Sequence, residues 1–123
     1  MTRDMDLIRD LLLGIDAEPL LDGNHWVTPG QQHKLGVIGK YSEDEVAYHL
    51  VLLIEAGLVV GNTTMDMPIV SRLTWEGHEL VNNIRDTGIW ARTKHRVKDL
   101  PTVGIGVLVE VAKAEIKRHL GLP

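Results

Sequence analysis

Histidine, serine and carboxylate side chains are the groups in this sequence that could perform catalysis or bind a metal. The six histidines are never three or four residues apart and none lies in an HExxH pattern, which is the spacing that places two zinc ligands on one face of a helix. Ser42 and Ser71, the two serines, lie outside a GxSxG pattern, and no phosphate-binding P-loop is present. There is no cysteine to act as a thiolate. The sequence therefore predicts a protein that is not an enzyme, without metal ligands or cofactors.

An acidic group of side chains begins the segment YSEDEVAYHLVLLIEAGLVV (41–60), and two methionines follow in the loop GNTTMDM (61–67). Methionines on an exposed loop suit an adaptable apolar contact, although they could also fold back onto the core. The carboxylates have a simpler explanation as well, because acidic residues stabilise the N-terminal end of a helix. The candidate protein-binding face consists of side chains that we expect to be exposed: Glu43, Asp44, Glu45, Tyr48, His49, Met65 and Met67.

A basic group lies near the C-terminal end. If the two predicted helices that carry it lie side by side, its residues form one positive face, the best case in this sequence for contact with nucleic acid. The simpler interpretation is a solvated helix surface. The candidate nucleic-acid contacts are Arg92, Lys94, Arg96, Lys98, Lys113, Lys117 and Arg118.

Apolar spacing and capping residues predict the elements that position these groups. Ser42 and Glu45 match a capping box, Gly57 suits a left-handed helix end, and Thr74 is a suitable N-cap. Trp75 and Trp90 are expected to pack in the core or an interface. The pattern predicts helices over 4–16, 42–56, 75–85, 88–97 and 103–120, strands over 58–60 and 68–74, and two further short strand candidates at HWVT (25–28) and KLGVIG (34–39).

The last predicted helix has more apolar residues than a terminal helix needs to pack on a small core. We expect it to bury this surface against a second copy of the chain, because appended helices of this kind often form symmetric dimers. The candidate dimer interface consists of Val103, Val107, Leu108, Val111, Ile116 and Leu120.

The order of elements predicts a fold that is mainly α with a small β-hairpin (α+β). We expect a winged helix-turn-helix-like core over residues 1–87 and a C-terminal helical extension over 88–123, within a single domain. The segments RDMDLIRDLLLGI, SEDEVAYHLVLLIEAGLVVG and SRLTWEGHEL resemble an uncharacterised bacterial and prophage family, winged-helix-like, known as a domain of unknown function (DUF2513). The resemblance implies the fold and a phage or mobile-element context, and it brings no catalytic residue or ligand.

Composition limits the functions that remain. The 123 residues carry a net charge of −4, whereas nucleic-acid binders usually show a basic footprint. The N-terminus does not resemble a signal peptide and no apolar run is long enough to cross a membrane, so we expect a cytoplasmic protein. The sequence favours a phage or mobile-element accessory protein that contacts a host or phage protein through its acidic surface. Regulation of, or interference with, host nucleic-acid machinery is the expected effect of that contact. The alternative is a dimeric winged-helix DNA-binding transcriptional regulator.

Overall fold

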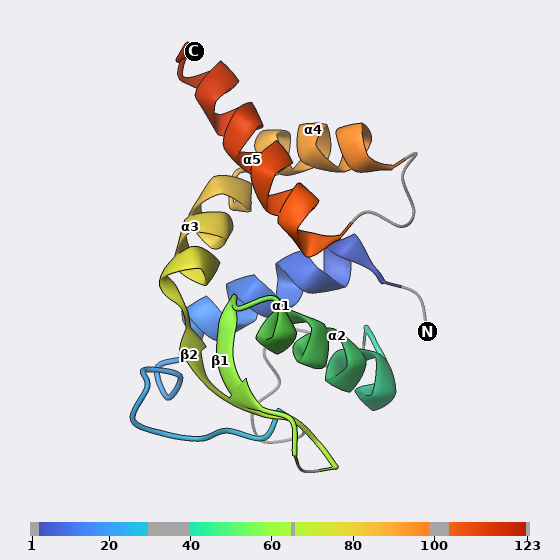
Figure 1. Cartoon of the computed structure of the whole chain (residues 1–123), viewed down its shortest axis with the longest axis vertical. Helices are drawn as coiled ribbons and strands as arrows, with labels where there is room; N and C mark the ends of the chain where they lie inside the picture. The colour runs from blue at the N-terminus through green and yellow to red at the C-terminus, as the bar shows by residue number, and fades with distance from the viewer. Residues whose placement is uncertain (1–2, 30–39, 65, 99–103, 123) are drawn as a thin grey trace. The chain divides into compact units, whose positions relative to one another are not determined.

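The computed structural model describes residues 3–29, 40–64, 66–98 and 104–122. In these ranges the chain is mostly helical and carries one two-stranded antiparallel hairpin (Figure 1), which confirms the predicted α+β class. The winged-helix description of the core stays a prediction. The elements are α1 (Met5–Ala17), α2 (Glu43–Glu55), β1 (Val59–Asn62), β2 (Ile69–Leu73), α3 (Trp75–Ile84), α4 (Thr87–Val97) and α5 (Ile105–His119).

The chain forms two compact units, Met1–His78 and Glu79–Pro123, here called unit 1 and unit 2. The division falls within α3, whereas the sequence analysis placed it after residue 87. Of the two further strand candidates, 34–39 lies outside the described residues. The other, at 25–28, contributes a single antiparallel bridge between Val27 and Val70 of β2.

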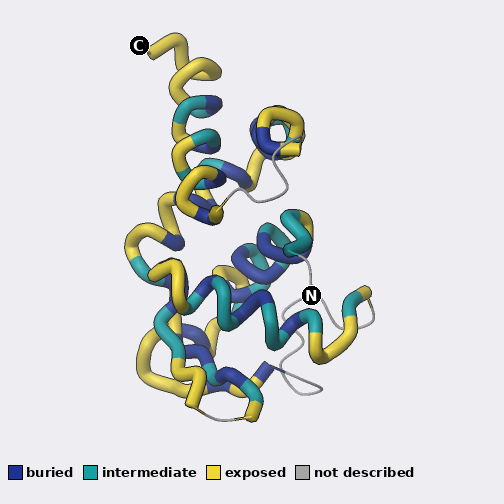
Figure 2. Tube along the Cα trace, turned by 45° about the vertical axis from the view of Figure 1, so that its right-hand side comes forward, coloured by how far each residue is buried: buried dark blue, intermediate teal, exposed yellow. Residues whose placement is uncertain are grey.

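Helix α1 forms one side of the core of unit 1. The Asp4 side chain caps its first turn by accepting hydrogen bonds from the backbone N–H groups of Asp6 and Leu7, at 3.0 and 3.2 Å. The helix packs against both α2 and β2. Apolar residues recur along one face of the helix, and that face is buried (Figure 2). The buried residues of α1 are Leu7, Ile8, Leu11, Leu12 and Ile15.

Helix α2 begins at the predicted capping box, in which Ser42 Oγ accepts from the Glu45 N–H and the Glu45 carboxylate accepts from the Ser42 N–H. Two backbone donors at the start of the helix are thereby satisfied. The helix ends at Glu55, and Gly57, two residues later, has a φ of +77°, the left-handed conformation that favours glycine after a helix end. Both predicted ends of α2 are confirmed.

The hairpin pairs Val59 with Leu73 and Asn62 with Ile69, and its register shifts between Val60 and Gly61. Thr74 then caps α3, because its Oγ1 accepts from the Gly77 N–H at 3.1 Å and donates to the Gly57 carbonyl at 2.6 Å. The expectation that Trp75 packs in the core is wrong, because Trp75 is 74 % exposed at the first position of α3. The other alternative, an interface, stays a prediction.

In unit 2, α4 and α5 lie against each other. The Asp86 carboxylate caps α4 by accepting from the Ile89 N–H at 2.9 Å. Trp90 is buried, as predicted. The residues buried on α4 are Ile89, Trp90, Thr93 and Val97, and those buried on α5 are Ile105, Leu108, Ala112 and Glu115.

The burial of α5 residues removes one residue, Leu108, from the predicted dimer interface. Leu108 is fully buried within the chain and has no exposed surface for a second copy. Val107 and Leu120 are 46 % and 64 % exposed, and Val111 and Ile116 are half-buried. Val103 lies outside the described residues, and the dimer itself stays a prediction. No helix in the described part of the chain is long and apolar enough to cross a membrane.

Candidate functional site

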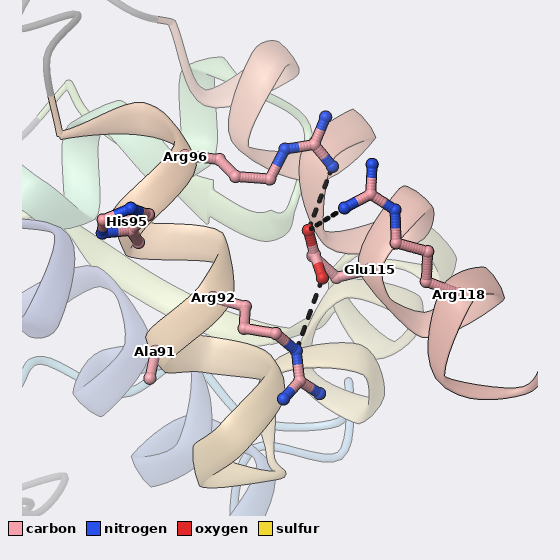
Figure 3. A pocket seen from close by; sticks show the side chains of 6 residues that line it. All are labelled: Ala91, Arg92, His95, Arg96, Glu115 and Arg118. Carbon is pink, nitrogen blue, oxygen red and sulfur yellow. Dashed lines mark hydrogen bonds and ion pairs between the residues drawn. The ribbon is translucent and has the colours of Figure 1, made fainter.

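Unit 2 contains an open pocket of about 350 Å³ between α4 and α5 (Figure 3). Its position follows from the helix pairing, since residues three or four apart on one helix face point toward the same neighbour. Arginine side chains from both helices reach into it. The pocket is lined by Ala91, Arg92, His95, Arg96, Glu115 and Arg118.

Glu115 organises the pocket, although its side chain is only 2 % exposed. Its Oε1 lies 3.0 Å from Arg96 Nη1 and 3.6 Å from Arg118 Nη1, and its Oε2 lies 3.5 Å from Arg92 Nε. A buried carboxylate is costly unless it is paired, and three guanidinium groups pair this one. Both helices supply these guanidinium groups, so the ion pairs link α4 to α5.

The same three arginines leave the pocket positive. One carboxylate against three guanidinium groups gives the lining a formal charge of +2 when His95 is neutral. The three guanidinium-bearing side chains are 51, 38 and 70 % exposed for Arg92, Arg96 and Arg118, so their charges are open to solvent and to a ligand.

The sequence analysis made a common positive face conditional on the two basic helices lying side by side. Helices α4 and α5 do lie against each other, and they bring Arg92, Arg96 and Arg118 together. Contact of these residues with nucleic acid stays a prediction. The remaining candidates are arranged differently. Lys94 Nζ lies 5.8 Å from the centre of the Trp90 ring, and Lys113 pairs with Glu110 at 3.5 Å. Lys98 and Lys117 are exposed outside the pocket.

Sequence reasoning missed Glu115, although a signal was present. Glu115 follows Leu108 and Ala112 at helical spacing, so it continues the apolar stripe of α5 with a carboxylate. A charged residue at a core position requires a partner, and Arg118 one turn later is the nearest one in the sequence.

Unit 1 contains the acidic group. Glu43 and Asp44 are exposed in the first turn of α2, and in the described part of the chain their side chains have no ion-pair or hydrogen-bond partner. Helix α1 lies nearby, since the Tyr41 hydroxyl donates to Asp10 Oδ2 at 3.4 Å.

The ionisation of Tyr41 reports on the burial of its hydroxyl and on the negative charge around it. Burial, followed by the negative charges of Asp4, Asp10 and Asp6, raises the pKa of the Tyr41 hydroxyl to about 12. Asp4, Asp6 and Asp10 therefore place negative charge at Tyr41, two residues before Glu43 in the chain. We call this region the acidic surface and define it by Asp4, Asp6, Asp10, Glu43, Asp44 and Glu45.

The expectation that His49 is exposed is wrong. It is fully buried, its Nε2 accepts the Asp4 N–H at 2.7 Å, and its Nδ1 donates to the Glu45 carbonyl at 2.7 Å. It joins the start of α1 to α2 and has no surface for a partner. Tyr48 is half-buried, with its ring edge-on to the His49 ring at 5.3 Å. Met67 is half-buried, and Met65 lies outside the described residues.

Comparison with known proteins identifies the family. A family model described as a hypothetical protein (DUF2513) matches residues 2–104. An uncharacterised protein of Haemophilus influenzae (strain ATCC 51907 / DSM 11121 / KW20 / Rd) is 30 % identical over 125 residues, covering 98 % of this chain and 99 % of that protein. No solved structure matches. The chain belongs to the DUF2513 family.

Proposed function

We propose that this chain is a non-enzymatic, winged-helix-like accessory protein of a phage or mobile element, and that it binds a host or phage protein through the acidic surface. The observation that carries the proposal is the exposure of Glu43 and Asp44 at the start of α2. These carboxylates are free of side-chain partners in the described ranges, and the hydroxyl of Tyr41, two residues before Glu43, donates to Asp10 of α1.

The order of elements explains why this end of α2 matters. Helix α1, the bridge at Val27, α2 and the hairpin follow one another as in a winged-helix protein, and α2 then occupies the position of the recognition helix. Carboxylates at that end repel phosphates, whereas they attract lysine and arginine on a protein. We therefore infer a partner with a basic surface, such as a component of nucleic-acid machinery that the chain regulates or inhibits.

Reversing the two exposed charges tests this proposal. The double variant Glu43→Lys, Asp44→Lys keeps Ser42 and Glu45, which form the capping box, so the helix retains its N-terminal hydrogen bonds. We expect affinity purification from the native host, with nuclease added, to recover a partner with the wild-type chain and to lose it with the variant.

A matched control separates a specific surface from total charge. The variant Glu55→Lys, Glu76→Lys changes the net charge equally at two exposed positions outside the acidic surface. It should retain the partner. Equal loss with both variants, or retention with both, would contradict the proposal.

The alternative function, a dimeric DNA-binding regulator, is supported by the basic residues of α4 and α5. Neutralising phosphates with lysine and arginine releases counterions, so affinity for DNA would fall steeply with salt. Replacing Arg92, Lys94 and Arg96 with Ala would then weaken binding and flatten the salt dependence. Co-purification that disappears on nuclease treatment would favour this alternative over the first proposal.

A further inference from the structure

We propose that the pocket between α4 and α5 is a binding site for a phosphate monoester. This inference goes beyond the proposed function, because the pocket belongs to unit 2 and requires nothing from the acidic surface.

Charge is the first argument. The lining has a formal charge of +2, and a phosphate monoester carries about −1.5 to −2 near neutral pH.

The direction of the guanidinium groups is the second argument. Arg96 and Arg118 each direct Nη1 to the same oxygen of Glu115. Their other terminal nitrogens lie on one side of that carboxylate (Figure 3), and these nitrogens have no further partner in the described ranges. Two adjacent guanidinium groups with outward N–H donors fit the oxygens of one phosphate group.

The buried position of Glu115 gives the arrangement its stability. Guanidinium groups repel one another, and free arginine side chains lose rotamer entropy when a ligand orders them. Glu115 offsets the repulsion and holds Arg92, Arg96 and Arg118 near one point before a ligand arrives. It is a positioning residue that need not touch the phosphate.

Size and composition favour a monoester with an organic group over a bare ion. A volume of about 350 Å³ lies at the lower end of the range for small-molecule sites, larger than one phosphate requires. Ala91 supplies an apolar wall and His95 a planar ring with donor and acceptor nitrogens. A carboxylate of a partner protein is a weaker candidate ligand, because its one charge and two oxygens would engage fewer of the guanidinium N–H donors.

Calorimetric titration of the full chain tests the proposal, with inorganic phosphate, adenosine 5′-monophosphate and adenosine as probes at constant ionic strength. We expect saturable binding of the two phosphates and no binding of adenosine. Arg118→Gln should weaken phosphate binding about tenfold, corresponding to the loss of charged hydrogen bonds worth about 1.4 kcal/mol. Because Arg118 is 70 % exposed, this variant should keep its fold, which circular dichroism would verify.

Lys113→Gln is the matched control, because it removes one positive charge from the same helix at a residue outside the pocket. We expect it to change phosphate affinity less than about twofold, as for an exposed charge screened by salt. Weakening equal to that of Arg118→Gln would reduce the effect to general electrostatics and overturn the proposal. Absence of saturable binding by both phosphate probes would overturn it as well.

A final pair of probes identifies the source of the phosphate. A short single-stranded oligonucleotide with a 5′ phosphate is compared with the same strand without it. Tighter binding of the phosphorylated strand than of the mononucleotide assigns the site to the end of a nucleic acid, and equal binding assigns it to a free mononucleotide. If both strands bind equally and the mononucleotide does not bind, the arginines contact backbone diesters and the monoester proposal is wrong.

Discussion

Residues 1–78 carry twelve Asp or Glu and five Lys or Arg, which gives a formal charge of −7. Residues 79–123 carry five Asp or Glu and eight Lys or Arg, which gives a formal charge of +3. The net charge of −4 for the whole chain hides this asymmetry. In unit 1, Asp4 and Glu45 bind backbone N–H groups at helix starts, while Glu43 and Asp44 remain exposed. In unit 2, the buried Glu115 binds side chains instead.

The difference teaches that the location of a carboxylate decides its role. A carboxylate at a helix start stabilises the backbone and still presents charge to a partner. A carboxylate buried between two helices collects cations and leaves its surroundings positive. Opposite surfaces thus arise in one small chain, and the two proposed sites can be tested separately.

The largest expected effect concerns the buried histidine of unit 1. His49→Ala should lower the free energy of unfolding by about 3 kcal/mol, because it leaves a cavity and removes the acceptor of the Asp4 N–H. Urea denaturation would measure this change. His78→Ala is the control, since that histidine is half-exposed and should cost no more than about 0.5 kcal/mol. Equal losses of unfolding free energy in the two variants would show that the buried contacts of His49 do not stabilise the fold more than an exposed histidine does.

In unit 2 the corresponding change is Glu115→Gln, which should cost about 2 kcal/mol. Breaking a buried ion pair typically costs about 3–5 kcal/mol, and the expected loss is smaller here because the three arginines remain partly hydrated. In a Trp26→Phe, Trp75→Phe background, the buried Trp90 reports unfolding of unit 2 by its fluorescence. Glu110→Gln, an exposed carboxylate on the same helix, should leave stability nearly unchanged. If Glu115→Gln also left the free energy of unfolding nearly unchanged, the ion pairs of Glu115 would contribute no more to stability than solvent-exposed ones.

Local signals account for the parts of the fold that were predictable from sequence. The capping box at Ser42, the glycine stop at Gly57 and the cap at Thr74 depend on residues within four positions of one another, and all three are confirmed. The burial of His49 was not predictable in this way, because its partner Asp4 is 45 residues away in sequence. The exposure of Trp75 likewise depends on how α3 leaves the hairpin.

The two candidate sites also differ in whether local sequence signals predict them. Exposed carboxylates at Glu43 and Asp44 follow from their place in the first turn of an amphipathic helix. The arginine pocket requires the pairing of α4 with α5. The positions of the basic residues in the sequence do not by themselves predict that pairing. Only Glu115, a carboxylate at a core position, indicated from sequence that the arginines converge.

A smaller effect tests the backbone role of the polar groups in unit 1. Ser42→Ala should lower stability by about 1 kcal/mol, because the Glu45 N–H loses its acceptor. Glu45→Gln should cost less, since glutamine can also complete a capping box. Thermal denaturation of both variants would rank them, and a larger loss for Glu45→Gln would show that its charge matters more than its hydrogen bond.

Alkaline titration examines the burial of Tyr41 and the negative charge around its hydroxyl. The pKa of Tyr41 is raised from 10.0 to about 12, so the folded state retains this proton at a pH where the unfolded chain loses it. The resulting stabilisation is complete below pH 10 and is lost as the pH rises toward 12. Tyr41→Phe should remove this part of the pH dependence of urea denaturation. An unchanged dependence in the variant would show that folding does not raise the pKa of Tyr41.

The smallest expected change in stability concerns the exposed apolar side of α5. Val107→Glu should alter the free energy of unfolding by no more than about 0.5 kcal/mol, because Val107 is 46 % exposed. Its effect on assembly should be larger, since α5 buries Leu108 and Glu115 within the chain and leaves Val107 and Leu120 for a second copy. Light scattering at micromolar concentration should give the mass of two chains for the wild type and of one chain for Val107→Glu.

Lys117→Glu is the control for added negative charge, because Lys117 is an exposed residue of the same helix. This variant should remain dimeric. A wild-type mass of 13.7 kDa would end the dimer prediction. The outcome also bears on the contrast between the units. In a dimer through α5, two arginine pockets belong to one particle and a nucleic acid with two phosphate contacts gains from their linkage. In a monomer, each pocket must bind its ligand alone.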